Sequence, residues 1–392
     1  MPFATFEEIL AFLPQLDSPL HDMRDIVLGN LIAIGEIPAP TFEERQRVEF
    51  LQQRFTDSDS LECSTDEMGN VYAMLPGESG QKNLLVMAHL DTIFPADDDH
   101  TITVSADEAT GIAVADNSLG IAVMASLPHL LRRLDIRLQS NLILMGAART
   151  LGRGNLAGLR FFLEHSILPI HTGIAVEGIE LGRLSYSSIG MLRGEITCMV
   201  PDDYDWTRFD TTGAIINLIE VINQIIAIPL PRQPRTTVVL GSIEGGEQAY
   251  GKIAKFAQLR FEIRSESAET VESIREQIQE IVLEQSARTN KTITVEFFGK
   301  RTPGGLAISH PLCRQTRKIM EALAVEPRVS PSLVGLSAFI DRNIPAITLG
   351  ITMGQRSKES SETILLAPIV KGIAQLIGVL LAIDGGFCDE TR

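Results

Sequence analysis

The sequence is short of positive charge. Its 392 residues include 34 lysines and arginines against 50 aspartates and glutamates, which leaves a formal net charge of −16. Nucleic acids and anionic membrane surfaces attract basic proteins, so this balance argues against both as partners. It says little about small ligands, because bulk charge is screened while a pocket keeps a sign of its own.

Cysteine is also scarce. The four cysteines, Cys63, Cys198, Cys313 and Cys388, are scattered singly, without a CxxC pair or the spacing of a disulfide framework. The N-terminal run MPFATFEEILAFL carries acids where a secretory signal needs basic residues. Together these features predict a cytoplasmic protein.

One apolar stretch, residues 364–383, approaches the length of a membrane span. Pro368 stands where a helix would begin, and Lys371 interrupts the run. Its large apolar residues recur at helical spacing, as Ile369, Ile373, Leu376, Ile377 and Leu380. The pattern favours a buried C-terminal helix, and no membrane association is expected.

The first 190 residues alternate between helical and strand-like patterns. The expected helices cover 22–34, 42–55 and 119–133, and the expected buried strands cover 70–75, 83–89 and 141–147. Such alternation is typical of an α/β domain in which helices cover a mixed or parallel sheet.

The pattern changes near residue 191. Strands at 192–200, 237–246, 256–264 and 292–298 and helices at 211–227 and 269–287 follow in the order β-α-β-β-α-β. This is the ferredoxin-like unit. Beyond it we expect a helix at 310–323, a strand at 345–350 and the final helix. We therefore predict a discontinuous α/β domain, 1–190 and 300–392, interrupted by a smaller domain at 191–299.

Two loops that follow strand-like segments carry candidate metal ligands. AHLDTIFP contains His89 and Asp91, and VADNSLG contains Asp116. An imidazole ligand with a nearby carboxylate to orient it, and a second carboxylate to share the ion, suits a zinc site. Two alternatives stay open here. His89 and Asp91 could close a strand end as a hydrogen-bonded pair, and Asp116 could be the N-cap of the 119–133 helix.

The motifs AHLDTIFP, ADNSLGIAV, GRGNLAGLR, LGSIEGG, FEIRSES and NIPAITLG occur in this order over nearly the whole chain. In them the sequence resembles the dizinc exopeptidase and deacylase family, which includes carboxypeptidase G, acetylornithine deacetylase, succinyl-diaminopimelate desuccinylase, peptidase T and aminoacylase. The resemblance implies a zinc-binding α/β domain interrupted by a lid domain through which two copies form a homodimer. It also implies hydrolysis of peptide or N-acyl amino-acid C–N bonds.

The resemblance further implies that His89, Asp116 and Glu177 hold one zinc ion and that Asp91 orients His89. Glu177, in the run IAVEG, stands where the family usually has aspartate. Taken without the family, Glu177 beside Gly178 could be part of a solvated turn.

Positions that correspond to the second metal carry other residues. The family's acidic pair, which supplies the general base and a ligand, falls on Thr150 and Leu151 next to Arg149. The terminal histidine falls closest to Lys358, with Glu362 as the following acid, and no histidine occurs after His310. Apart from the family, Lys358 and Arg356 are most simply interpreted as a charged surface loop.

The lid departs from the family as well. Tyr204 takes the position of a histidine that would help to hold the scissile carbonyl oxygen, whereas Arg264 matches the lid arginine. These two residues are the predicted substrate contacts.

Loss of a general base costs about 10² to 10⁴ in rate. We therefore expect at most one zinc ion and an impaired or lost hydrolytic activity toward a small peptide or N-acyl amino acid. Replacement ligands from Asp97–Asp99, Glu359 or Glu362 remain open. The alternative is a non-catalytic ligand-binding or structural homologue that acts as a dimer or as the partner of an active relative.

Overall fold

The computed structural model describes residues 3–59, 61–201, 213–289, 291–332, 335–356 and 361–390. The chain divides into two compact units. The interrupted unit comprises Met1–Ser188 and Gly305–Arg392, and the inserted unit comprises Ile189–Gly304. The predicted domain boundaries, at 190/191 and 299/300, lie close to the points where the chain passes from one unit to the other. The predicted α/β class, with a ferredoxin-like insert, is confirmed.

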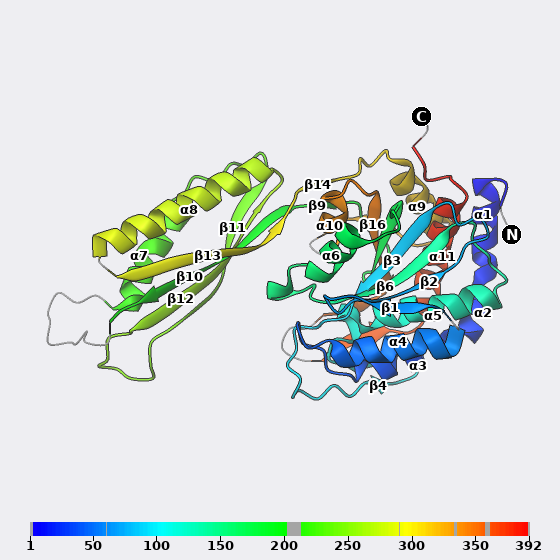
Figure 1. Cartoon of the computed structure of the whole chain (residues 1–392), viewed down its shortest axis with the longest axis horizontal. Helices are drawn as coiled ribbons and strands as arrows, with labels where there is room; N and C mark the ends of the chain where they lie inside the picture. The colour runs from blue at the N-terminus through cyan, green and yellow to red at the C-terminus, as the bar shows by residue number, and fades with distance from the viewer. Residues whose placement is uncertain are drawn as a thin grey trace. The chain divides into compact units, whose positions relative to one another are not determined.

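An eight-stranded mixed sheet forms the centre of the interrupted unit (Figure 1). Its order is β1 (Cys63–Thr65), β2 (Val71–Leu75), β6 (Asn141–Ala147), β3 (Asn83–His89), β7 (Thr172–Ile179), β16 (Ala346–Thr352), β8 (Arg183–Ser185) and β15 (Arg328–Val329). Strands β6, β3, β7 and β16 run parallel to one another. Their carboxyl ends therefore meet at one edge, where open α/β sheets build their sites.

Side chains along the central strands alternate between two cores. In β3, Leu84 and Val86 join the larger core, and Leu85 and Met87 join the smaller one. The larger core also includes buried residues of α1 (Phe6–Phe12), α2 (Asp17–Asp22), α3 (Arg24–Gly35), α4 (Arg45–Asp59), α5 (Leu119–Arg133), α9 (Pro311–Ala322) and α11 (Ile369–Asp384). The smaller core includes α6 (Ala157–His165) and α10 (Leu336–Ile340). Burial on both faces explains why β3 and β6 are continuous apolar runs.

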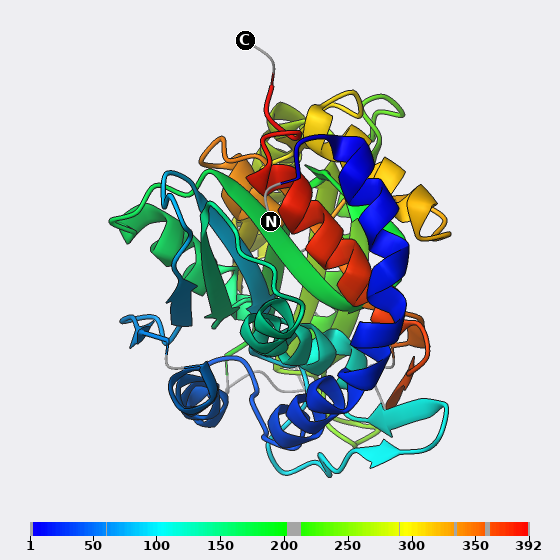
Figure 2. The ribbon, with the colours of Figure 1, turned by 90° about the vertical axis from the view of Figure 1, so that its right-hand side faces the viewer.

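The C-terminal helix α11 lies inside the larger core, beside the N-terminal helices drawn in blue in Figure 2. Its apolar residues from Ile369 to Ile383 are buried, as the helical spacing predicted. Among the described residues, Val114–Arg133 is the one helical stretch that is long and apolar enough to cross a membrane, and its apolar window is 89% buried. Burial of this extent is typical of a core helix.

The interrupted unit has a second, smaller sheet of four strands, which was not predicted from the sequence. It has the order β17 (Gly354–Gln355), β18 (Glu362–Leu365), β5 (Glu108–Gly111) and β4 (Thr103–Val104). Glu362 pairs with Gly111, shortly before the segment that carries Asp116. The pairing thus brings two distant parts of the chain together at the candidate site.

Arg47, on α4, is fully buried. Its Nε donates to the carbonyl of Ile37 at 2.8 Å, and its Nη1 donates to the carbonyl of Leu90 at 3.0 Å. Nη2 lies 3.5 Å from the carbonyl of Gly35. Since Leu90 separates His89 from Asp91, this arginine anchors the backbone that carries both.

The inserted unit follows the predicted β-α-β-β-α-β order. Its elements are β10 (Gly190–Met199), α7 (Ala214–Ile226), β11 (Thr236–Gly245), β12 (Phe256–Ser265), α8 (Ala268–Thr289) and β13 (Thr292–Arg301). The antiparallel sheet has the order β11-β12-β10-β13, and both helices contribute to one core beneath it. Val271, Ile274 and Ile278 form the buried stripe of α8. Short strands β9 (Ser187–Ser188) and β14 (Gly304–Gly305) pair where the chain crosses between units.

Candidate metal centre

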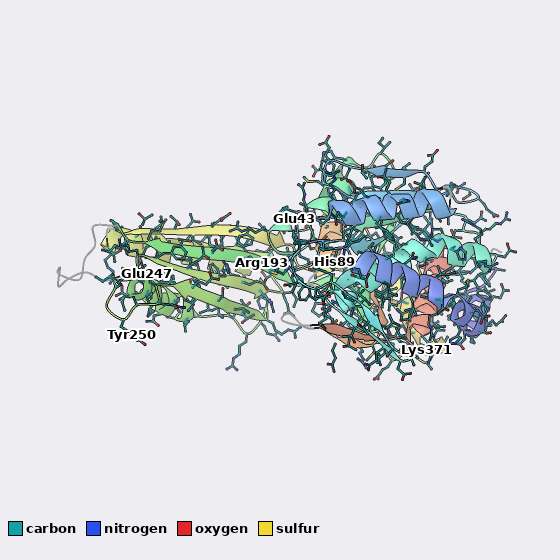
Figure 3. All side chains as sticks on the ribbon, turned by 90° about the horizontal axis from the view of Figure 1, so that it is seen from below. Glu43, His89, Arg193, Glu247, Tyr250 and Lys371 are labelled. Carbon is teal, nitrogen blue, oxygen red and sulfur yellow. The ribbon has the colours of Figure 1, made fainter. Side chains whose placement is uncertain are left out.

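His89 is the last residue of β3 and is 1% exposed. Its Nδ1 lies 2.9 Å from the backbone oxygen of Asp91 and 3.7 Å from the Asp91 carboxylate, while its Nε2 lies 3.0 Å from Asp116 Oδ1. Burial alone would lower the pKa of His89, but hydrogen bonds to Asp116 and Asp91 and nearby acidic charges raise it well above its usual value. The imidazole is thus fixed in a strongly acidic pocket (Figure 3 labels His89).

The Asp91 carboxylate is held by three donors. Its Oδ2 accepts the Thr41 hydroxyl at 2.8 Å and the backbone N–H groups of Thr150 and Leu151 at 2.9 and 2.7 Å. The buried Oδ1 has no hydrogen-bond partner among the described residues. Thr150 and Leu151, the positions predicted for the family's acidic pair, therefore present backbone donors to Asp91, and neither side chain carries a carboxylate.

Asp116 lies in the segment η2 (Val114–Ser118), where its own backbone is non-helical (φ −129°, ψ 82°), and it precedes a cis peptide bond to Asn117. The N-cap position of α5 belongs to Ser118, so the alternative that Asp116 merely caps this helix is wrong. Burial raises the pKa of Asp116, but the hydrogen bond to His89 and the positive charges of His89, Arg356 and Arg183 outweigh it and bring the pKa to about 2. The carboxylate is anionic at neutral pH.

Glu177 lies within β7, beside β3 in the sheet, and is 2% exposed. A solvated turn, the other interpretation of this residue, is therefore wrong. Ligand atoms of His89, Asp116 and Glu177 all lie within 4.8 Å of one another. No second group of three or more histidine, cysteine or acidic side chains meets this criterion in the part of the chain that the structure describes.

Arg356 reaches both carboxylates of this triad. Its Nη2 donates to Glu177 Oε2 at 2.8 Å, and its Nη1 lies 3.5 Å from Asp116 Oδ2. Arg356 is an exposed loop residue, as the surface-loop interpretation held, but its guanidinium contacts two carboxylates of the triad. Arg149, the basic residue noted from the sequence, instead contacts Met68 Sδ and lies over the Phe42 ring.

Glu362 supports the triad from the small sheet. Its Oε2 accepts the backbone N–H groups of Ala115 and Asp116 at 2.9 and 3.0 Å. Burial and the nearby charge of Asp116 raise the pKa of Glu362 to about 7, although the two backbone donors oppose the shift. Glu362 therefore fixes the backbone of a candidate ligand and is not itself in the triad.

The other predicted residues lie elsewhere. Arg264 is in β12 of the inserted unit, where its Nε donates to Glu262. Asp97–Asp99 form an exposed loop in which Asp99 accepts the backbone N–H of Thr101. Tyr204, Lys358 and Glu359 lie outside the described residues. The substrate contacts proposed for Arg264 and Tyr204 stay predictions.

The triad suits one zinc ion chemically. One imidazole nitrogen and two carboxylates with an open position are the donors of catalytic zinc sites, and a second acceptor on the far ring nitrogen is the usual support. The carbonyl of Asp91 supplies that acceptor for His89. Arg356 opposes the ion, because it already contacts both carboxylates.

Comparison with known proteins agrees with the geometry. Residues 209–290 match the family described as a peptidase dimerisation domain, and residues 70–148 match peptidase family M28. No curated protein matches the chain in sequence. Among solved structures, the di-peptidase Dug1p from Saccharomyces cerevisiae superposes with a TM-score of 0.77 at 12% identity, over 98% of this chain and 99% of that one.

The M20 family metallo-carboxypeptidase Sso-CP2 from Sulfolobus solfataricus superposes with a TM-score of 0.75 at 14% identity, over 91% of this chain and 99% of the other. Over 91% of its length, this chain has the fold of an M20 family metallo-carboxypeptidase. YXEP from Bacillus subtilis, described as a dinuclear metal binding peptidase from the same family, superposes with a TM-score of 0.62 at 14% identity, over 93% and 98% of the two chains. The predicted resemblance to the M20 dizinc exopeptidases is confirmed.

Proposed function

We propose that the protein is a metallopeptidase or amidohydrolase of the M20 type whose site holds at most one zinc ion and whose hydrolytic activity is impaired or lost. One observation carries the proposal. His89, Asp116 and Glu177 gather as one ligand set, while Thr150 and Leu151 offer only backbone donors where the second metal and the general base would need carboxylates.

A zinc ion held by the triad would act as a Lewis acid that polarises the carbonyl of a bound substrate. The chain's own groups prepare this position. The Asp91 carbonyl orients the His89 ring, and Glu362 fixes the backbone of Asp116. Among the described residues, no carboxylate stands at Thr150 or Leu151, the positions predicted for the general base, and loss of a general base costs about 10² to 10⁴ in rate.

The substrate or ligand class is a small peptide or N-acyl amino acid. Support comes from the fold, which is shared with proteins described as a di-peptidase and a metallo-carboxypeptidase. The four cysteines are free, which supports a reducing compartment and hence the cytoplasm.

The inserted unit is proposed to form a homodimer. Apolar residues Ile215, Ile216, Ile219 and Ile226 are exposed on α7, and Ile243 is exposed on β11, the edge strand of the sheet. An open strand edge beside exposed isoleucines invites pairing with a second copy. The match of residues 209–290 to a peptidase dimerisation domain supports the same partner.

The proposal is tested by zinc content per chain, measured by elemental analysis on untagged protein from zinc-supplemented cells. We expect one zinc ion or fewer, lost in His89→Ala and retained in His165→Ala, which removes an exposed histidine on α6. Hydrolysis of a dipeptide and an N-acyl amino-acid panel should be at or near background. Two ions per chain, or turnover of the order of 10 per second, would overturn the proposal.

A further inference from the structure

We propose that the Arg356 guanidinium is a built-in cation that competes with zinc for Asp116 and Glu177 and so lowers the zinc affinity of the site. This inference rests on the proposed assignment of the triad as the zinc site. Its observations are the two contacts of Arg356, at 2.8 Å to Glu177 Oε2 and at 3.5 Å to Asp116 Oδ2.

The two carboxylates require a positive partner. The side chain of Glu177 is 3% exposed and that of Asp116 is 29% exposed, so water solvates Glu177 very little. A buried carboxylate without a cation is strongly disfavoured. A zinc ion or a guanidinium can each meet this need, and the guanidinium stays charged at any pH at which the protein is folded.

Both cations bind the same two carboxylates. Arg356 holds Oε2 of Glu177 and approaches Oδ2 of Asp116, while the other Asp116 oxygen, Oδ1, contacts His89. An ion that binds His89 and both carboxylates therefore meets the positive charge of Arg356 at close range. Zinc must either displace the guanidinium or bind against its repulsion, and both weaken binding.

The competition lowers affinity without blocking the site, because Arg356 has a route to solvent. Its side chain is 33% exposed, and it follows the exposed strand β17. A displaced guanidinium can be hydrated, whereas Glu177 cannot follow it. Zinc at sufficient concentration should thus replace Arg356, which predicts a site that fills only when zinc is abundant.

The test compares Arg356→Gln with Arg342→Gln, a matched control that breaks a surface ion pair with Glu164 at 3.1 Å. Zinc affinity is measured by competition with a chelating indicator, and melting temperature is measured in EDTA and in zinc. We expect R356Q to bind zinc at least tenfold more tightly than wild type. Its melting temperature should fall in EDTA, where Glu177 loses its partner, and recover in zinc. R342Q should match wild type in affinity.

The outcomes separate this inference from the proposed function. If R356Q binds zinc no more tightly than a wild type that holds one His89-dependent ion, the competition is refuted and the zinc site stands. If the tighter binding persists in R356Q/H89A, the ion is elsewhere and the triad assignment fails.

Should R356Q not fold, as judged by circular dichroism, Arg356→Lys provides the test. A lysine keeps the positive charge but lacks the rigid fork, and its ammonium is more strongly hydrated, so zinc should displace it more easily than it displaces Arg356. Zinc affinity should therefore rise above wild type, and an unchanged value refutes the inference.

Discussion

Arg47→Met tests whether a buried arginine holds the backbone beneath the metal centre. Two of its hydrogen bonds, to the carbonyls of Ile37 and Leu90, are 2.8 and 3.0 Å long, and the third contact, to Gly35, is 3.5 Å and counts for little. Burial lowers the pKa of Arg47 to about 10, opposed by the charge of Asp91, so the guanidinium is charged at neutral pH.

A methionine side chain fills much of the volume of the arginine side chain but donates no hydrogen bond. Hydrogen bonds from a charged donor contribute about 1.5–3 kcal/mol each, so two of them amount to roughly 3–6 kcal/mol. The apolar side chain avoids the cost of burying a charge, and this stabilises the folded state of the variant by about 1–4 kcal/mol. Two carbonyls nevertheless stay buried without a donor. The net expectation is a loss of about 2–4 kcal/mol in the free energy of unfolding.

Two assays on the full chain test this expectation. The first is urea unfolding, and the second is native-state hydrogen exchange read from peptides that cover β3 and the residues after it. R47M should lower the unfolding midpoint and speed exchange at Leu90 and Asp91. Arg45→Met is the matched control on the same helix, because the Arg45 side chain is 88% exposed and should tolerate the change without measurable effect. A midpoint for R47M equal to that of the control would refute the reasoning.

Two further predictions concern pH and assembly. His310 caps α9 by accepting the N–H of Leu312 on Nδ1 at 3.1 Å, and burial lowers the pKa of His310 below 6.5 despite nearby Glu390. Protonation of Nδ1 removes this acceptor, so the stabilisation by the cap is present above pH 6.5 and is lost as the pH falls below 6.5. An asparagine at this position still caps the helix but does not titrate. The melting temperature of wild type minus that of His310→Asn should therefore decrease from pH 7.5 to pH 5, and a difference that stays constant contradicts the cap. Ile243→Lys, on the exposed edge strand, should give monomers in sedimentation velocity at micromolar concentration, whereas Leu283→Lys on α8 should not; a monomeric wild type contradicts the homodimer.

The sequence predicts elements well where one physical signal dominates. Buried strands at 83–89 and 141–147 and the helix at 119–133 have the bounds that the apolar runs indicated, because each is a continuous buried apolar run with polar residues at one or both of its ends. The small sheet of β4, β5, β17 and β18 was missed. Its strands are two to four residues long, and two of them are exposed throughout, so they are too short to carry a periodic signal.

At the site, His89 ends β3 and Glu177 lies within the neighbouring parallel strand β7, whereas Asp116 follows β5 of the small sheet. The resemblance to the family implied all three as ligands, because their arrangement spans two sheets and strand patterns alone do not show it. Arg356 was not identifiable, since an arginine in a loop resembles a solvated charge. One signal was available. Two candidate ligands are acidic and come from strand-like, buried runs, and a buried carboxylate needs a positive partner, so a cation from the chain itself could have been sought. Arg47 was missed for a similar reason, because one arginine on an amphipathic helix rarely marks a buried donor.

The order of strands in the interrupted unit has a consequence for the newly synthesised chain. The partner of β7 on one side is β16, which begins at Ala346, after the whole inserted unit. At roughly 5–20 residues per second, the ribosome needs on the order of ten seconds or more to travel from the end of β7 to β16. During that interval the inserted unit can fold, while β7 presents an unpaired, apolar edge. Nascent chains of this protein should therefore depend on protection from aggregation at this edge until the C-terminal residues emerge.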